Sequence, residues 1–211
     1  PYHLILLCNA IAVLGERALD DGVASGLPLW RRHVVVSREL ITTAPEEDGY
    51  LSAHGYGLVR LAECLVGLGE HTEARALFEE AVGASGAIPA GWRSASASTT
   101  LAVAYAGLAR EEARAKRLPE AETAYRAGLK AAEAAWRADG RTPALVWAVV
   151  IGLELAELIA VSLPEEASKL AATVRARAGQ LRRLGFTVAD ETERRTSALL
   201  TPRKARTPKH P

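Results

Sequence analysis

Apolar residues recur at spacings of three and four along most of the chain, interrupted by single glycines and prolines. That spacing places them on one face of a helix. One run carries its apolar face at Leu58, Leu61, Leu65 and Leu68. Gly69 then ends the pattern, and Thr72 can cap a second helix. This second helix has a small, a large and a small residue on one face, at Ala74, Phe78 and Ala81.

The pattern of that second helix returns further along the chain. The clearest copy has Ala121, Tyr125 and Gly128 in the same order. A weaker copy follows at Ala167, where Ala171 replaces the aromatic ring. The alanines that open these helices are 47 and 46 residues apart, and one more step back falls near Leu29. Four units of two helices therefore fit the chain, the first one loosely.

The periodicity predicts an all-α chain. Residues 1–200 are expected to form one helical repeat domain. Residues 201–211 contain three prolines, four basic residues and no acid, so we expect a basic, Pro-rich tail that is disordered in isolation. The predicted helices cover residues 2–20, 27–42, 48–68, 72–84, 93–116, 119–138, 143–162, 164–184 and 190–200.

This repeat resembles the tetratricopeptide (TPR) motif, in which small residues lie where two helices approach and a large one fills the space between pairs. The unit is longer than the roughly 34 residues of the ordinary motif. It resembles the extended TPR variants of bacterial signalling proteins, and the Ala- and Arg-rich texture resembles actinobacterial sequence. The resemblance implies a right-handed α-solenoid of about four antiparallel helix pairs. A compact helical bundle, the rival architecture, predicts no repeat.

The charges of the chain nearly cancel, since 26 basic residues face 25 acidic ones. This balance argues against nucleic acid as a partner, because phosphate binding needs a strongly basic face. Cys8 and Cys64 lie inside apolar helical patterns, which favours buried free thiols and a reducing cytoplasm. The sequence starts at Pro1 and contains no Met, so we expect a piece of a larger protein.

Residues 3–14 are almost continuously apolar. They follow no basic segment and are too few to span a bilayer, so a first helix packed against its neighbour is expected, with no membrane contact. Such a helix would still expose an apolar face. A homo-oligomer formed through this N-terminal helix is therefore a second expectation.

No residues have the arrangement of a catalytic or metal centre. The five histidines do not pair with Cys, Asp or Glu at metal-ligand spacing. The serines between residues 94 and 98 have no nucleophile-elbow glycines. We expect no enzymatic activity and no cofactor or metal.

The resemblance implies that ligands bind the concave surface formed by the first helix of each pair. The residues expected there are Tyr56, Arg60, Glu63, Arg110, Arg114 and Trp147. The arginines can grip an acidic partner, although pairing with neighbouring Glu111 and Glu112 explains Arg110 and Arg114 as well. The carboxylate clamp of chaperone-binding TPR domains is not visible. Trp147, like Trp30, Trp92 and Trp136, is interpretable as a packing residue or an anchor.

Two functions follow from this reading. The first is a protein-interaction module, either an adaptor or the sensor or scaffold part of a larger regulatory protein, which binds a peptide or partner helix in its groove. The alternative is a sensor for a small ligand or signal peptide, whose binding changes the curvature of the solenoid.

Overall fold

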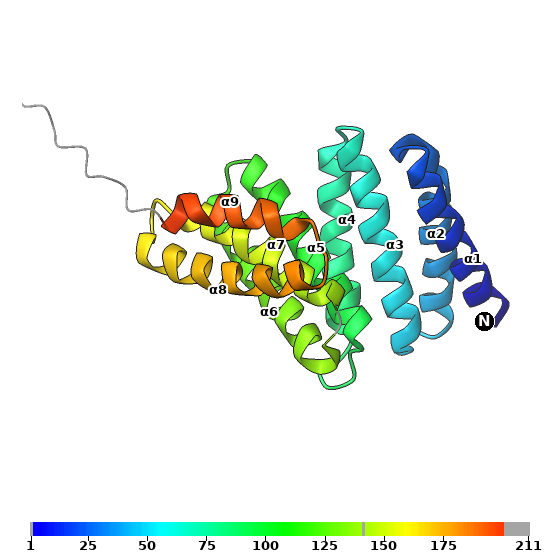
Figure 1. Cartoon of the computed structure of the whole chain (residues 1–211). Helices are drawn as coiled ribbons and strands as arrows, with labels where there is room; N and C mark the ends of the chain where they lie inside the picture. Colours follow the sequence, from blue (N-terminus) through cyan, green and yellow to red (C-terminus); the bar gives the residue numbers. More distant parts are fainter. Residues whose placement is uncertain (1, 141, 201–211) are drawn as a thin grey trace, which may run out of the picture. The chain divides into compact units, whose positions relative to one another are not determined.

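The computed structural model describes residues 2–140 and 142–200, which form nine helices and no strand (Figure 1). Each predicted helix is present, within three residues at either end except for the start of the second. The helices are α1 (Tyr2–Asp20), α2 (Val23–Thr43), α3 (Asp48–Gly67), α4 (His71–Ala87), α5 (Ala95–Arg114), α6 (Leu118–Asp139), α7 (Thr142–Ile159), α8 (Pro164–Arg183) and α9 (Val188–Leu200).

The helices group into two compact units, and the boundary falls inside α7, between Trp147 and Ala148. Unit 1 holds α1 to α6 with the start of α7, and unit 2 holds the rest of α7 with α8 and α9. A single domain over residues 1–200 therefore stays a prediction. The predicted tail, residues 201–211, lies outside the described residues.

The turns inside the helix pairs of unit 1 repeat every 47 residues. Gly22, Gly69 and Lys116 all have positive φ, at 113°, 83° and 62°. After α3, the Gly69 N–H donates to Val66 O and the next N–H donates to Leu65 O, at 3.1 and 2.9 Å. The turn at Lys116 makes the equivalent two bonds. These are Schellman caps, which satisfy the last carbonyls of a helix. The repeat seen in the sequence is thus a repeat of backbone conformation.

The first pair differs from the sequence expectation. The sequence predicts a helix over residues 27–42, but α2 begins four residues earlier, at Val23, and Pro28 lies inside it. Proline is common in the first turn of a helix, which made it a misleading start signal here. The same four- and three-residue spacing is met in α2 by Gly26, Trp30 and His33, all buried, which lie 48 residues before Ala74, Phe78 and Ala81 and place a histidine where the pattern has a small residue.

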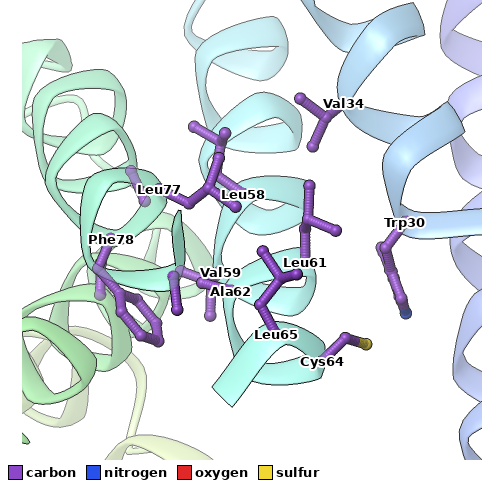
Figure 2. Close-up of a cluster of buried hydrophobic side chains, with 13 residues drawn as sticks. Trp30, Val34, Leu58, Val59, Leu61, Ala62, Cys64, Leu65, Leu77 and Phe78 are labelled. Atoms are coloured by element: carbon purple, nitrogen blue, oxygen red, sulfur yellow. The ribbon is translucent and has the colours of Figure 1, made fainter. Parts of the chain in front are cut away.

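In unit 1, aromatic rings of one helix pack directly against glycines of a neighbouring helix. Figure 2 shows the cluster around α3, with Trp30 from α2 on one side and Phe78 from α4 on the other. A Cβ atom on Gly107 of α5 would lie 2.3 Å from the Phe78 ring, and one on Gly15 of α1 would lie 2.8 Å from Trp30. Only glycine allows these approaches.

The first helices of the pairs lie on the inner side of unit 1. The backbones of α1 and α3 approach each other, as do those of α3 and α5. In the described residues, the backbones of α2 and α4 do not approach each other in this way, although the Arg38 guanidinium of α2 lies 2.9 Å from the Glu80 carboxylate of α4. First helices that converge while second helices diverge produce a concave surface formed by the first helices.

Unit 2 has its own small-residue core. Ala167, Ala171 and Val174 of α8 are buried, so this weaker copy of the pattern packs with an alanine in the aromatic position. The α8 helix ends at Arg183 and is followed by Gly185, whose φ is 83°, and α9 packs back against α8. Arg195 of α9 holds Glu157 of α7 through two hydrogen bonds, the longer of 2.8 Å.

The ring-to-glycine contact can be tested with two substitutions of the same kind. Gly107→Ala puts a methyl group into the Phe78 ring, and we expect a loss of about 1–3 kcal/mol in the free energy of unfolding. Gly83→Ala, in α4 with nothing within 4 Å, should instead gain about 0.5–1 kcal/mol from helix propensity. Urea unfolding of both variants measures this. Equal effects would contradict the packing described.

Candidate binding groove

A groove of about 340 Å³ lies on the inner surface of unit 1, and every residue that lines it belongs to the first helix of a pair. The α1 helix contributes one residue, α3 four, α5 four and α7 one. They are Glu16, Tyr56, Val59, Arg60, Glu63, Ser96, Thr99, Thr100, Val103 and Trp147.

Glu16 accepts hydrogen bonds from two groove residues of α3. The Tyr56 hydroxyl donates to Oε1 at 2.5 Å. The Arg60 guanidinium donates through Nε and Nη2, at 2.7 and 2.6 Å. Burial and the hydrogen bond to Glu16 raise the pKa of Tyr56 above its ordinary value, so the phenol stays protonated. These bonds join α1 to α3 across the groove.

Arg60 is also paired on its other side. Its Nη1 donates to Glu63, one turn further along α3, and its Cζ lies 5.7 Å from the centre of the Trp30 ring. Burial opposes the charged form of Arg60, but Glu16 and Glu63 together raise its pKa above the usual range. For Glu63, burial outweighs the attraction of Arg60, and its pKa is raised. Arg60 thus meets two carboxylates of its own chain before any ligand arrives.

The remaining predicted residues are divided between the groove and the outside. Trp147 lines the groove, and Cζ of Arg110 lies 5.9 Å from the centre of its ring. Arg114 is not among the lining residues. Its side chain is half-exposed, and its Nε lies 2.9 Å from the Glu111 carboxylate. This is the surface ion pair that the sequence offered as the alternative to ligand binding. The structure therefore brings Tyr56, Arg60, Glu63 and Trp147 together and places Arg110 beside them.

The sequence reading missed Glu16, although the repeat contains the signal that would have found it. Glu16, Glu63 and Arg110 are 47 residues apart and occupy the same position on α1, α3 and α5. The first unit was aligned too loosely for this register to be used. The hydroxyl side chains of α5 that line the groove, Ser96, Thr99 and Thr100, were not predicted as binding residues.

Trp92 is 80% exposed, so it does not have the burial expected of a packing residue. It lies in the loop before α5, where it lines a second hollow with Pro45 and Pro89. Trp30, in contrast, is fully buried, as a packing residue should be.

Two buried polar pairs in unit 1 have the residue types of catalytic sites. Ser37 Oγ lies 2.8 Å from His54 Nδ1, and His54 Nε2 lies 3.2 Å from Glu80. Cys8 Sγ lies 3.3 Å from His33 Nε2. Both Ser37 and Cys8 are fully buried, so no substrate can reach either nucleophile in this conformation. Burial also raises the pKa of the Cys8 thiol to about 11, which keeps it un-ionised.

Among the described residues, no group of three or more His, Cys, Asp or Glu side chains is placed to hold a metal ion. Within residues 2–140 and 142–200, two helices, α1 and α7, are long and apolar enough to cross a membrane by length and composition alone. The expectation that the first apolar segment is too short was wrong in this respect, because the helix extends to 19 residues. Most of the apolar stretch of α7 is buried, as in the core helix of a folded domain.

Comparison with known proteins identifies the fold. No family model matches the chain, and no curated protein matches its sequence. Two crystal structures of a Podosopora anserina protein assigned as a kinesin light chain, with nearly identical TPR-like repeats, are similar in structure. One of them is a single-site variant. Both have a TM-score of 0.58 at 16% identity, over 90% of this chain and 93% of theirs. The chain has a TPR-like fold. The predicted fold class is confirmed.

The buried His33 gives the stability of the protein a pH dependence. Burial and the charge of His54 lower the pKa of His33 to about 4, whereas in the unfolded chain it should be near the ordinary 6.5. Below pH 6.5 the unfolded state gains a proton that the folded state takes up only near pH 4, so the free energy of unfolding should fall over this interval. We expect a loss of about 2 kcal/mol between pH 7 and pH 5.

Urea unfolding at pH 7, 6 and 5 measures that loss. His33→Gln removes this titrating ring and should reduce the dependence, whatever the variant does to stability at pH 7; the part that remains comes from His54, whose pKa burial also lowers. An unchanged slope in this variant would show that other groups cause the effect.

Proposed function

We propose that this chain is a protein-interaction module that binds a segment of a partner protein in the groove lined by α1, α3, α5 and Trp147. One observation carries this proposal: all ten residues that line the groove come from first helices. In a helical-pair solenoid, this inner surface is the one suited to hold an extended peptide or a helix.

The chemistry of the groove supports a particular kind of segment. Val59, Val103 and Trp147 offer apolar contact, and three hydroxyl side chains of α5 offer hydrogen bonds. The charged lining consists of two carboxylates and one guanidinium, and the guanidinium is already paired with both carboxylates. This arrangement favours an apolar segment with a cationic side chain near Glu16 and Glu63 over capture of a free C-terminal carboxylate by Arg60.

The wider role that we propose is that of an adaptor, or of the sensor or scaffold part of a larger regulatory protein of the actinobacterial type. The long repeat unit and the Ala- and Arg-rich composition support it. A cytoplasmic location is part of this proposal, supported by two buried cysteines that remain free thiols.

A small-ligand sensor is the alternative. The size of the groove favours it, since about 340 Å³ lies within the range of small-molecule sites. Because Glu16 links α1 to the groove residues of α3, a ligand that displaced this link would alter the spacing of the first two pairs.

Filling the groove tests the proposal. Ser96 is exposed at the groove, so Ser96→Trp should block it without disturbing the core. Ser25→Trp is the matched control, since Ser25 is exposed on α2, away from the groove. The probe is a peptide selected from a random display library for binding to the wild type. It should bind Ser96→Trp at least about tenfold more weakly than the wild type, a loss of roughly 1.4 kcal/mol in binding free energy. Its affinity for the control should be unchanged.

Isothermal titration of both variants gives the comparison. Equal affinities would place peptide binding elsewhere on the molecule. A thermal-shift panel of metabolites on the same proteins distinguishes the small-ligand sensor from the peptide-binding module. A small ligand at about 100 times its Kd should raise the free energy of unfolding of the wild type by roughly 2.7 kcal/mol. A ligand that stabilises the wild type and not Ser96→Trp, with no peptide selected, would favour the sensor.

A further inference from the structure

Trp92 is 80% exposed, more than any other large apolar residue that the structure describes. Its indole belongs to the loop between α4 and α5 and forms part of a hollow of about 350 Å³. This hollow shares no lining residue with the groove of the first helices. Tryptophan is among the residues that most often anchor protein interfaces, so an exposed indole at a hollow indicates a second binding surface.

The loop that carries Trp92 is held in place on both sides of the indole. Ile88 is buried at its start, and the Arg93 guanidinium donates to Ile88 O at 2.6 Å. The Trp92 N–H donates to Pro89 O at 2.9 Å. Ser94 caps α5 directly afterwards. The indole is therefore exposed on a loop whose backbone is fixed, rather than at the tip of a loose one.

The hollow lies between two successive loops that join helix pairs. The α2–α3 loop and the start of α3 form one side, and the end of α4 and the α4–α5 loop form the other. With Trp92, the apolar lining consists of Pro45, Leu51, Ala87 and Pro89. The polar lining consists of the carboxylates of Glu46 and Asp48, and none of the described residues that line the hollow is basic.

The acidic side of the hollow has no cationic partner in the described part of the chain. Glu46, Glu47 and Asp48 are consecutive, and none of their carboxylates forms an ion pair there. Asp48 lies in the first turn of α3, where the helix dipole favours a negative charge. Glu46 is exposed in the loop and has no such role. Arg93, next to the indole, instead donates to backbone carbonyls. The hollow is therefore complementary to a cation.

Two other tryptophans of unit 1 show which cation suits an indole in this protein. The Arg60 guanidinium lies 5.7 Å from the centre of the Trp30 ring while it binds the Glu16 carboxylate at 2.6 Å. The Arg110 guanidinium lies 5.9 Å from the centre of the Trp147 ring. A guanidinium suits both partners because its flat face stacks on an indole while the N–H groups at its edge donate to a carboxylate.

Trp92 and its neighbouring carboxylates offer the same two kinds of contact. In the described residues, no guanidinium of the chain itself lies over the Trp92 ring. A lysine ammonium suits the hollow less well, because it holds its water more tightly and has no plane to stack on an indole. We propose that this hollow binds an arginine side chain of a partner protein. The guanidinium lies over Trp92 and donates to Glu46 or Asp48, and the methylene groups pack against the apolar lining.

The indole N–H of Trp92 reports on this site in a proton–nitrogen correlation spectrum of the whole chain, and Trp92→Phe assigns its resonance by the loss of the signal. The probe is N-acetyl-arginine methylamide, for which we expect a saturable shift. The lysine derivative should bind at least about threefold more weakly. The citrulline derivative has the same shape without the charge and should bind at least about tenfold more weakly.

A charge-matched pair of variants tests the acidic side. Glu46→Gln/Asp48→Asn should weaken binding of the arginine derivative at least about threefold. Asp20→Asn/Glu39→Gln removes the same charge at exposed positions of α1 and α2 that do not line the hollow, and it should leave the affinity unchanged. Circular dichroism checks that both variants are folded. Equal weakening in the two variants would mean only long-range attraction and would overturn the proposal.

A display selection tests the partner segment. Ser96→Trp is the bait, because it fills the groove and leaves this hollow open. We expect the selected peptides to be enriched in arginine and to bind at least about tenfold more weakly when Trp92→Ala is added. Because the groove of the bait is filled, this result does not depend on whether the groove binds a peptide.

Several results would contradict an arginine site. They are a lysine or citrulline derivative that binds as tightly as the arginine derivative, selected peptides without arginine, and peptides that Trp92→Ala leaves unaffected. An indole resonance that shifts with protein concentration alone would assign the hollow to a second copy of the chain instead.

Discussion

The spacing of the helix pairs in unit 1 depends on aromatic rings that lie directly against glycine backbone. The Phe78 ring fills the space in front of Gly107, and the Trp30 ring fills the space in front of Gly15. A side chain at either glycine would push the helices apart. Because an interior at native density adjusts little to added volume, these contacts set the distance between neighbouring helices and so the curvature of the inner surface.

The polar chemistry of the groove follows from a variation at one of these contacts. Arg60 occupies in α3 the position that Gly107 occupies in α5, 47 residues later. Where α5 lets the ring approach its backbone, α3 instead extends a guanidinium over Trp30 and on to Glu16. The same repeat position therefore allows close helix packing at Gly107 of α5 and forms ion pairs at Arg60 of α3. Arg60 is the one of the two that lines the groove.

The architecture could be predicted because the same local signals recur in each unit. Gly69 follows α3 at a positive φ, where glycine is expected, and the alanines and Phe78 mark the packed face of α4 without any tertiary information. The first pair was harder, since Gly26, Trp30 and His33 replace the usual residues and Pro28 lies inside the helix. Lys116 shows a related limit, because a lysine at positive φ carries no sequence signal for a turn.

The groove was only partly predictable, for a physical reason. Counting along α3 located Tyr56, Arg60 and Glu63, since neighbours on one helix face follow from periodicity. Their partner Glu16 lies 44 residues from Arg60, and only the packing of α1 on α3 brings the two together. The buried contacts of His33 and His54 were missed for the same reason.

A stack of helix pairs behaves as a one-dimensional array, in which each pair is held mainly by its nearest neighbours. The α1–α2 pair borders a neighbour on one side only among the described residues, whereas the α3–α4 pair borders one on each side. Within unit 1, opening of the α1–α2 pair would therefore break contacts with one neighbouring pair, and opening of the α3–α4 pair would break contacts with two. Glu16 lies on the α1–α2 pair, so a local opening of α1 would remove one wall of the groove while the remainder of unit 1 stays folded. Under the proposed function, ligand binding in the groove and the packing of α1 on α3 are thermodynamically linked, so each would stabilise the other.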